Sequence, residues 1–311
     1  MQSNDKVSFV RELYSLANDI HGDQGALRRL FRTTSFMTWG FMHSKGIRQL
    51  SSLLRCEALT PVIRLNPKVI QKPFKPYVCR SWNKRRRMAE VASHFQLLSQ
   101  LFPNTIDQVY TYKKVKLLQI NDEDGNIYNL YIEQGHNKEG SLGIALRDAN
   151  DVGVFSSTFS LSSRQNGSLY VGAVQGPSSK VEGREKVIRS LTKAMHGLRP
   201  KALIVELLLM LAREFQLANV YGVSNRGHIY QSLRYLGRKK RGKVSFDYDT
   251  LWQEHGAEPV DPYLYALPLT LPRKEVAELK RSKRRLYTKR YQWLDELETE
   301  FRSNLKALMV H

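Results

Sequence analysis

Hydrophobic residues in the first third of the chain follow a helical spacing. One helical face carries four of them at spacings of three and four: Leu13, Leu16, Ala17 and Ile20. A second stripe of this kind runs from Met88 to Leu101 and stops before Pro103. These spacings predict amphipathic helices, so residues 1–105 are expected to form a helical N-terminal region. Four prolines within residues 60–77 predict an extended segment that crosses between the helices.

From about residue 107 the spacing of apolar residues changes to two, which is typical of strands with one buried face. Five strand candidates follow one another: VYTYKKVKLLQI, NIYNLYIEQ, SLGIALRD, VGVFSSTFSL and SLYVGAVQG. Short turns separate them, for example at Asp124-Gly125 and Asn166-Gly167. Connections this short predict an antiparallel meander.

The pattern after Gly176 predicts a crossover unit. One helical stripe comes first: Val187, Ile188, Leu191, Met195 and Leu198. Pro200 suits the first turn of a second helix, over about 200–216, which is apolar almost all round and should be buried. A strand at 219–225 follows, with another candidate at 263–269, and residues 274–308 predict one long helix. A strand, a buried helix and a strand form a crossover, so the sheet is expected to be mainly antiparallel with one parallel addition.

The charge of the chain changes the expectation about its partners. Lys and Arg number 49 and Asp and Glu 29, which gives a net charge of +20. The basic residues gather at 84–87, 234–243 and 280–290. The candidates for binding an anionic partner are Arg85, Arg86, Arg87, Lys239, Lys240, Arg241, Arg284 and Arg285. An acidic carrier protein, an anionic membrane surface and RNA all fit this charge. The absence of a base-reading motif disfavours sequence-specific DNA binding.

Several protein classes are disfavoured by what the sequence lacks. Cys56 and Cys79 are the two cysteines, and no Cys/His pair stands at zinc spacing, so neither a metal site nor a disulfide framework is expected. The longest apolar run, 202–212, is about half a membrane span, and the N-terminus lacks a signal-peptide core. We therefore expect a cytoplasmic protein, with the inner membrane surface as a place where it can bind. No GxSxG, Walker or HExxH motif is present, so no covalent intermediate is expected.

The loop HGLRPK, at residues 196–201, is a candidate anion site. It precedes a helix whose N-terminal amides and dipole favour phosphate, and Arg199 and Lys201 add charge beside Gly197. The loop and helix resemble the acyl-coenzyme A loop of GNAT-type acyltransferases, with one glycine in place of the usual two. The alternative is a proline-capped core helix that binds no ligand.

Three histidines are candidates for proton transfer. His94 lies on a predicted helix, His196 opens the loop, and His228 follows the end of a predicted strand. A neutral imidazole in such a place can act as a general base for an amine or hydroxyl. Asp247 can orient such a histidine. The alternatives are hydrogen-bonded structural histidines, and for Asp247 a turn before the helix that holds Trp252.

Several ordered motifs together resemble the VirK/YbjX family of bacterial proteins. They are VGAVQG, SLTKAMHGLRPKALIVELL, VYGVSNRGHIY, FDYDTLWQEHGA and KRSKRRLYTKRYQWLDEL, and the resemblance covers about residues 75–300. It implies a setting in virulence and in resistance to cationic antimicrobial peptides and envelope stress. It supplies no reaction and no catalytic residue, although Gln175 and Gly176 match its motifs.

These observations together predict an α+β protein. A helical region (1–105) precedes a GNAT-like, mainly antiparallel domain (106–270) and a basic C-terminal helix (271–311). The function predicted first is an acyltransferase-like enzyme of envelope modification, with acyl-CoA or an acyl carrier protein as donor. The predicted residues are His228, His196 and Asp247 for catalysis and Gln175, Gly176, Gly197, Arg199 and Lys201 for the donor. The alternatives are a non-catalytic basic adaptor that binds anionic lipid or RNA, and an aminoacyl-tRNA-dependent transferase.

Overall fold

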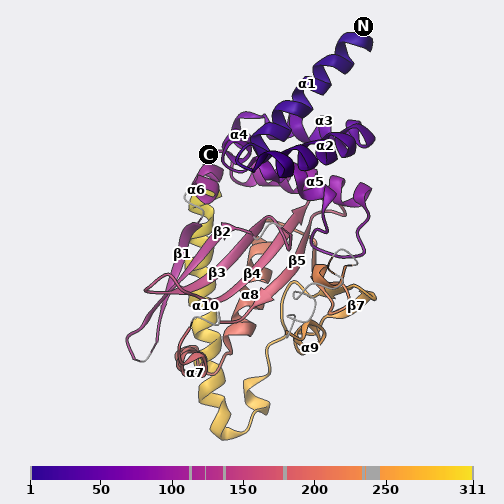
Figure 1. Ribbon diagram of the computed structural model, residues 1–311. Coiled ribbons are helices and arrows are strands. Elements are labelled where there is room, and N and C mark those ends of the chain that lie inside the picture. The colour runs from indigo at the N-terminus through magenta and orange to yellow at the C-terminus, as the bar shows by residue number, and fades with distance from the viewer. Residues whose placement is uncertain are drawn as a thin grey trace.

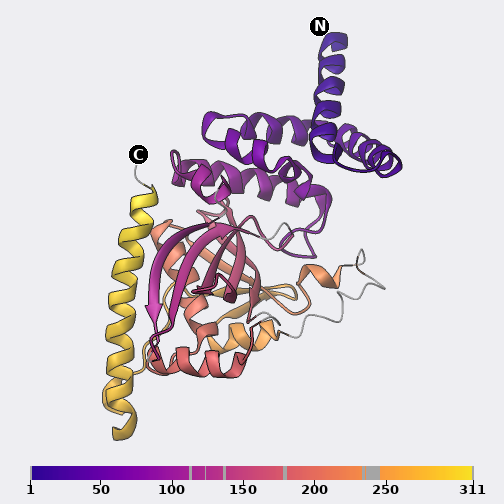
Figure 2. The same ribbon diagram turned by 60° about the vertical axis from the view of Figure 1, so that its left-hand side comes forward.

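The computed structural model describes residues 2–111, 114–122, 124–135, 138–177, 181–232, 235 and 246–309 (Figure 1). Helices of the N-terminal region stack at one end of a twisted sheet, and a long C-terminal helix runs along one side of it (Figure 2). This arrangement confirms the predicted α+β class, with a helical N-terminal region and a long C-terminal helix.

The N-terminal region is built from helices of different lengths. They are α1 (Gln2–His21), α2 (Ala26–Met42), α3 (Ser44–Leu54), α4 (Thr60–Leu65), α5 (Lys84–Leu101) and α6 (Ile106–Thr111), with 3-10 helices at Glu57–Leu59 and Pro67–Phe74. The helix α5 begins after Asn83, whose side chain accepts a hydrogen bond from the Arg86 amide, and it ends before Pro103 as predicted.

The prediction of an extended segment over residues 60–77 is wrong. Pro61 lies in the first turn of α4, and Pro67 opens the 3-10 helix. Proline is tolerated there because the first amides of a helix have no intrahelical partner. An extended stretch begins only after Phe74 and forms isolated β-bridges at Tyr77 and Cys79.

Eight strands form one mostly antiparallel sheet. They are β1 (Lys114–Asn121), β2 (Ile127–Gln134), β3 (Leu142–Asp148), β4 (Gly153–Ser162), β5 (Ser168–Gln175), β6 (Asn219–Val223), β7 (Glu258–Asp261) and β8 (Leu264–Leu267). Their order across the sheet is β1-β2-β3-β4-β5-β6-β8-β7. The predicted meander is therefore confirmed. The first predicted strand begins too early, because Val109 and Tyr110 are buried in α6, and β7 escaped prediction because all four of its residues are exposed.

The crossover between β5 and β6 is also confirmed. It contains α7 (Arg184–Ala194) and the buried helix α8 (Pro200–Glu214), with Pro200 in its first turn. Among the described strands, β5 and β6 are the one parallel pair, and their pairing runs from Ser168–Asn219 to Val171–Gly222. Beyond that point β5 continues to Gln175 without β6 beside it, which opens the sheet at this edge.

Two helices of the C-terminal part contact the sheet in different places. The helix α9 (Tyr248–Glu254) follows β6, and α10 (Arg281–Met309) packs beside β1 and α8. The predicted long helix thus begins seven residues later than expected. One cluster of buried apolar residues extends from Phe9 to Leu305, and the division into three parts stays a prediction. Among the described helices, none combines the length and the apolarity that crossing a bilayer requires.

Candidate functional site

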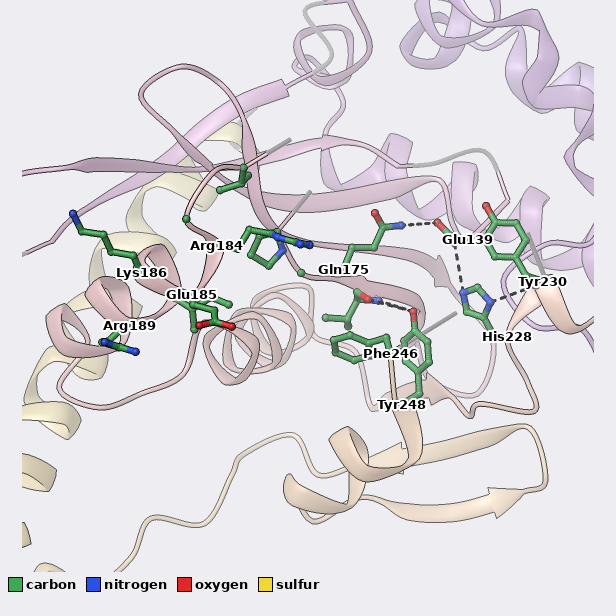
Figure 3. A pocket seen from close by; sticks show the side chains of 16 residues that line it. Glu139, Gln175, Arg184, Glu185, Lys186, Arg189, His228, Tyr230, Phe246 and Tyr248 are labelled. Atoms are coloured by element: carbon green, nitrogen blue, oxygen red, sulfur yellow. Dashed lines mark hydrogen bonds and ion pairs between the residues drawn. The ribbon is translucent and has the colours of Figure 1, made fainter. Parts of the chain in front are cut away.

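A cavity of about 1180 Å³ lies where β5 and β6 separate (Figure 3). Its walls come from the end of β5, the start of α7, the loop after β6 and the start of α9. The carboxyl ends of parallel strands are where ligands bind in many α/β proteins. The volume slightly exceeds the usual range for small-molecule sites, so a long or branched ligand can be accommodated.

Tyr248 fills part of the gap between the two strands. The Val174 amide donates to the Tyr248 hydroxyl, and this hydroxyl donates to the Val174 carbonyl, each at 3.3 Å. The phenol therefore replaces the strand partner that β5 lacks at this position. Burial raises the pKa of Tyr248 far above its usual value, so the hydroxyl stays protonated.

The start of α9 is fastened to the end of β6. The Asn225 side chain donates to Asp247 and accepts from the Tyr248 amide, each at 2.8 Å, and the Asn225 amide donates to Asp249. The Trp252 indole donates to the Val223 carbonyl at 2.8 Å. The motif FDYDTLW (residues 246–252) therefore attaches α9 to the end of β6, and this attachment directs Tyr248 into the cavity.

A buried carboxylate and a buried imidazole meet at the inner end of the cavity. Glu139 Oε1 lies 3.5 Å from His228 Nε2, which is an ion-pair distance rather than a short hydrogen bond. The other Glu139 oxygen accepts from the Gln175 side chain at 3.3 Å. The His228 ring stacks on Tyr248, and its Nδ1 accepts a long hydrogen bond of 3.4 Å from the Tyr230 amide (Figure 3).

Glu139 is placed by a turn that crosses over β5. A Cβ on Gly172 would lie 1.8 Å from the Glu139 carbonyl oxygen, so the crossing requires glycine at this position. The buried Lys72 ammonium donates to the Gly140 carbonyl and the Ser141 hydroxyl, each at 2.9 Å. The turn is therefore held in place by Gly172 of β5, on which it packs, and by Lys72 of the N-terminal region.

The extended stretch after Phe74 contacts the chain on both sides of the Glu139–His228 pair. The Val78 amide donates to the Lys138 carbonyl, and the Arg80 amide donates to the Gly227 carbonyl, each at 2.8 Å. Cys79 and His228 also form a β-bridge. Burial raises the pKa of the Cys79 thiol, which makes it a poor nucleophile although it lies next to the site.

The side chains around Glu139 and His228 can accept a proton from a ligand bound in the cavity or donate one to it. His228 has a protein partner at each ring nitrogen, so the geometry gives it the role of holding Glu139. The carboxylate faces the cavity and can accept a proton. Tyr230 also lines the cavity, and burial, followed by the charge of Glu139, raises the pKa of its hydroxyl to about 12, which keeps it a donor at neutral pH.

Comparison with known proteins places the chain in a family. Residues 25–303 match the family described as "Protein of unknown function (DUF535)". The chain belongs to this family. It is 27% identical to the uncharacterized protein YbjX of Escherichia coli over 277 residues, which cover 88% of this chain and 83% of that protein. An uncharacterized Haemophilus influenzae protein is 33% identical over 159 residues, about half of each chain.

These matches confirm the resemblance to YbjX and assign no reaction to the DUF535 family. No solved structure matches the chain, and the likeness of its sheet to GNAT acyltransferases stays a prediction.

The residues predicted for the site of this DUF535 protein fall into separate places. His228, Gln175 and Gly176 line the large cavity, whereas His196, Gly197 and Arg199 line a second cavity. Lys201 ion-pairs with Glu254 at 2.6 Å. Asp247 caps α9, and hydrogen bonds from Thr250 and Asn225 lower its pKa to about 2, which fits the alternative of a turn before the Trp252 helix.

His94 has a structural environment. Its Nδ1 accepts a hydrogen bond from the Leu161 amide, and burial lowers its pKa to about 3, so the ring stays neutral inside the core. The alternative interpretation of this histidine as a structural residue therefore fits the geometry.

The basic clusters differ in their surroundings. Arg86 lies over the Trp82 ring and 3.6 Å from Glu90, Arg87 is buried, and Arg85 is exposed. In α10, Arg284 donates to the Ala277 and Leu279 carbonyls, while Arg285 lines the second cavity. The predicted residues Lys239, Lys240 and Arg241 lie outside the described residues.

Glu139 and Lys72 are the site residues that sequence reasoning missed. Glu139 lies in a Lys-Glu-Gly turn between two strands, where a solvated carboxylate is expected. Lys72 lies among prolines in the segment that was expected to be extended. For both side chains the neighbouring sequence predicts exposure to solvent. They are buried because segments far away in the chain pack against them.

Proposed function

We propose that this DUF535 protein transfers an acyl group at the Glu139–His228 cavity. The observation that carries the proposal is the buried carboxylate–imidazole pair beside the unpaired end of β5. Tyr248 already occupies the backbone groups of Val174, but the chain beyond it, at Gly176, lines the cavity and can offer its backbone amide and carbonyl to an extended amide-containing arm, as in strand addition. The arms of acyl-CoA and of acyl carrier proteins have this chemistry.

The proposed reaction needs one proton transfer and no covalent enzyme intermediate. An acceptor amine or hydroxyl attacks the thioester carbon, a new C–N or C–O bond forms, and the C–S bond breaks. The acceptor proton passes to Glu139 and from there to solvent, and the departing thiolate takes a proton from solvent. General-base catalysis of this kind typically contributes about 10²–10⁴ to a rate.

His228 acts in this scheme through Glu139. In the tautomer that carries its proton on Nε2, the ring donates toward the carboxylate and fixes its orientation. Gln175 does the same at the second carboxylate oxygen. The original prediction that His228 or His196 is itself the base stays a prediction, and His196 belongs to the other cavity.

Donor binding can be tested by native mass spectrometry with added acyl-CoA of several chain lengths. Gly176 lines the cavity mouth, and a Cβ there would lie 3.7 Å from the Phe155 ring, so a larger side chain can be introduced. We expect Gly176→Trp to weaken acyl-CoA binding at least tenfold, because the indole occupies the space beside the end of β5 where the arm of the donor would lie. Gly153→Trp is the matched control, since a Cβ on Gly153 meets nothing within 4 Å. Equal binding by the two variants would contradict the proposal.

A second candidate function is attachment to an anionic membrane surface, which one feature of α2 favours. Three apolar residues near its start share one exposed face: Leu27 (86% exposed), Leu30 (65%) and Phe31 (76%). Arg28 and Arg32 lie exposed on the same two turns. Apolar side chains flanked by arginines are typical of helices that lie in the interface of an anionic bilayer.

Vesicle flotation tests this second candidate. We expect the protein to float with phosphatidylglycerol vesicles and to bind phosphatidylcholine vesicles much more weakly. Leu30→Asp should reduce flotation at least fivefold because it places a charge on the inserting face. Val260→Asp on β7 is the control, since Val260 is also exposed. Equal flotation of both variants would reject the α2 face, and stronger binding to RNA than to vesicles would favour the RNA adaptor.

A further inference from the structure

A second cavity, of about 710 Å³, lies between α7, the loop at 196–199 and α10. Five of its lining residues are cationic: Arg189, Lys193, Arg199, Arg285 and Lys289. Among the described residues that line it, none is acidic. We call this cavity the basic groove. Its volume lies within the range that small-molecule ligands occupy in proteins.

The cations of the basic groove come from two helices and from the loop between α7 and α8. Arg189 and Lys193 stand four residues apart on α7, and Arg285 and Lys289 stand four apart on α10. Like charges at this spacing repel each other on an isolated helix. Both pairs also face the same cavity, which adds repulsion between the helices. A bound polyanion would turn these repulsions into attractions.

The shape of the groove is set by contacts that do not involve these five side chains. Arg290 Nε donates to the His196 carbonyl at 2.9 Å and ties α10 to the loop. A Cβ on Gly197 would lie 2.7 Å from the Arg290 guanidinium, so glycine, at φ +79°, allows this close approach. The Gly197 amide in turn donates to the Thr192 carbonyl at 2.7 Å. The groove is therefore formed before any ligand arrives, which favours binding.

We propose that the basic groove binds the phosphate groups of a phosphorylated molecule. Arginine guanidinium groups match phosphate oxygens with two parallel hydrogen bonds, and three of the five cations are arginines. Ile188 and Leu286 also line the groove and can contact an apolar part of the same ligand.

The basic groove connects to the first cavity. Ile188 and Arg189 line both cavities, and Figure 3 shows Arg189 on α7 at the end of the first cavity away from His228. One ligand can therefore place its phosphates in the groove and extend its other end toward Glu139. The identification of this ligand as the acyl donor rests on the proposed function. The proposal that the groove binds phosphate does not.

Isothermal titration with inorganic pyrophosphate at constant ionic strength tests the groove. We expect Arg285→Gln/Lys289→Gln to weaken binding at least tenfold, and Arg189→Gln on the opposite wall to weaken it as well. The matched control is Lys283→Gln/Lys306→Gln, which removes two exposed charges from the same helix outside the groove and should change affinity less than twofold. No binding by the wild type, or equal weakening in both double variants, would overturn the proposal.

Competition identifies the source of the phosphate. Displacement of pyrophosphate by adenosine 3′,5′-bisphosphate would indicate a soluble phosphorylated molecule, and displacement by phosphatidylglycerol vesicles a lipid headgroup. Either result supports phosphate recognition, and pyrophosphate that neither competitor displaces would overturn the assignment to a phosphorylated molecule. His228→Asn separates the two proposals, since it should leave pyrophosphate affinity unchanged even where acyl transfer fails.

Discussion

At the scale of a single residue, the burial of Lys72 both supports the Glu139 turn and changes the pKa of the lysine. Its ammonium is fully buried and donates to two neutral oxygens, of Gly140 and Ser141. Burial lowers the pKa of this lysine to about 7. The rings of Tyr77 and His94 are two of its titratable neighbours, and neither carries a negative charge at neutral pH. Near pH 7 the residue next to the Glu139 turn is therefore partly protonated.

The lowered pKa of Lys72 predicts how the free energy of unfolding depends on pH. Below pH 7 both the folded and the unfolded chain hold the Lys72 proton, so the folded state carries the full cost of burying a charge. Between pH 7 and about 10.5 the folded state loses this proton while the unfolded chain keeps it. Stability should therefore rise with pH in this window, by up to about 1.4 kcal/mol per pH unit.

Denaturant unfolding at pH 7 and pH 9 measures the effect. The gain in the free energy of unfolding between the two pH values should be smaller in Lys72→Met than in the wild type. Lys306→Met, on an exposed lysine, should keep the wild-type gain. An identical pH dependence in all three proteins would show that Lys72 titrates normally.

At the scale of elements, the crossing of the Glu139 turn over β5 is the contact that builds the site. Gly172→Ala should destabilise the protein by about 1–3 kcal/mol, because the new methyl group collides with the backbone of the turn. It should also displace Glu139 and lower any activity of the cavity. Gly153→Ala is the control, since its methyl group meets nothing within 4 Å. Thermal unfolding that is equal for both variants would contradict this crossing.

The sequence predicts those elements whose buried faces repeat regularly. The meander, the buried helix α8 and the parallel strand β6 all follow from such repeats and from Pro200. The elements that differ, α4 and β7, lack that signal. Pro61, the proline of α4, occupies a first-turn position where it is tolerated, and β7 pairs with β8 while exposing every residue.

At the scale of the whole molecule, the site is assembled from segments far apart in the chain. Lys72, Glu139, Gln175 and His228 come together although more than 150 residues separate the first from the last. His228 could be found from the sequence because it follows a predicted strand, and Gln175 because it matches a motif of the family that the chain resembles. Glu139 could not, because its burial depends on Gly172 beneath it and on the N-terminal stretch beside it.

The charge of +20 is likewise distributed in ways that composition does not reveal. Arg87 is buried and Arg86 packs over the Trp82 ring, whereas Arg285 joins four other cations around the basic groove. Within the described residues, the basic clusters at 84–87 and 280–290 therefore differ in their surroundings. The groove between α7 and α10 is a local feature that follows from the packing of α10 against the 196–199 loop.

The most direct measurement is the rate of thioester cleavage with acyl-CoA and an amine acceptor in Glu139→Gln. We predict a loss of at least about 100-fold, because the amide cannot accept the proton of the attacking amine. Glu254→Gln, which removes a carboxylate paired with Lys201 outside the cavity, should keep the wild-type rate. A wild-type rate in folded Glu139→Gln would contradict the assignment of Glu139 as the base.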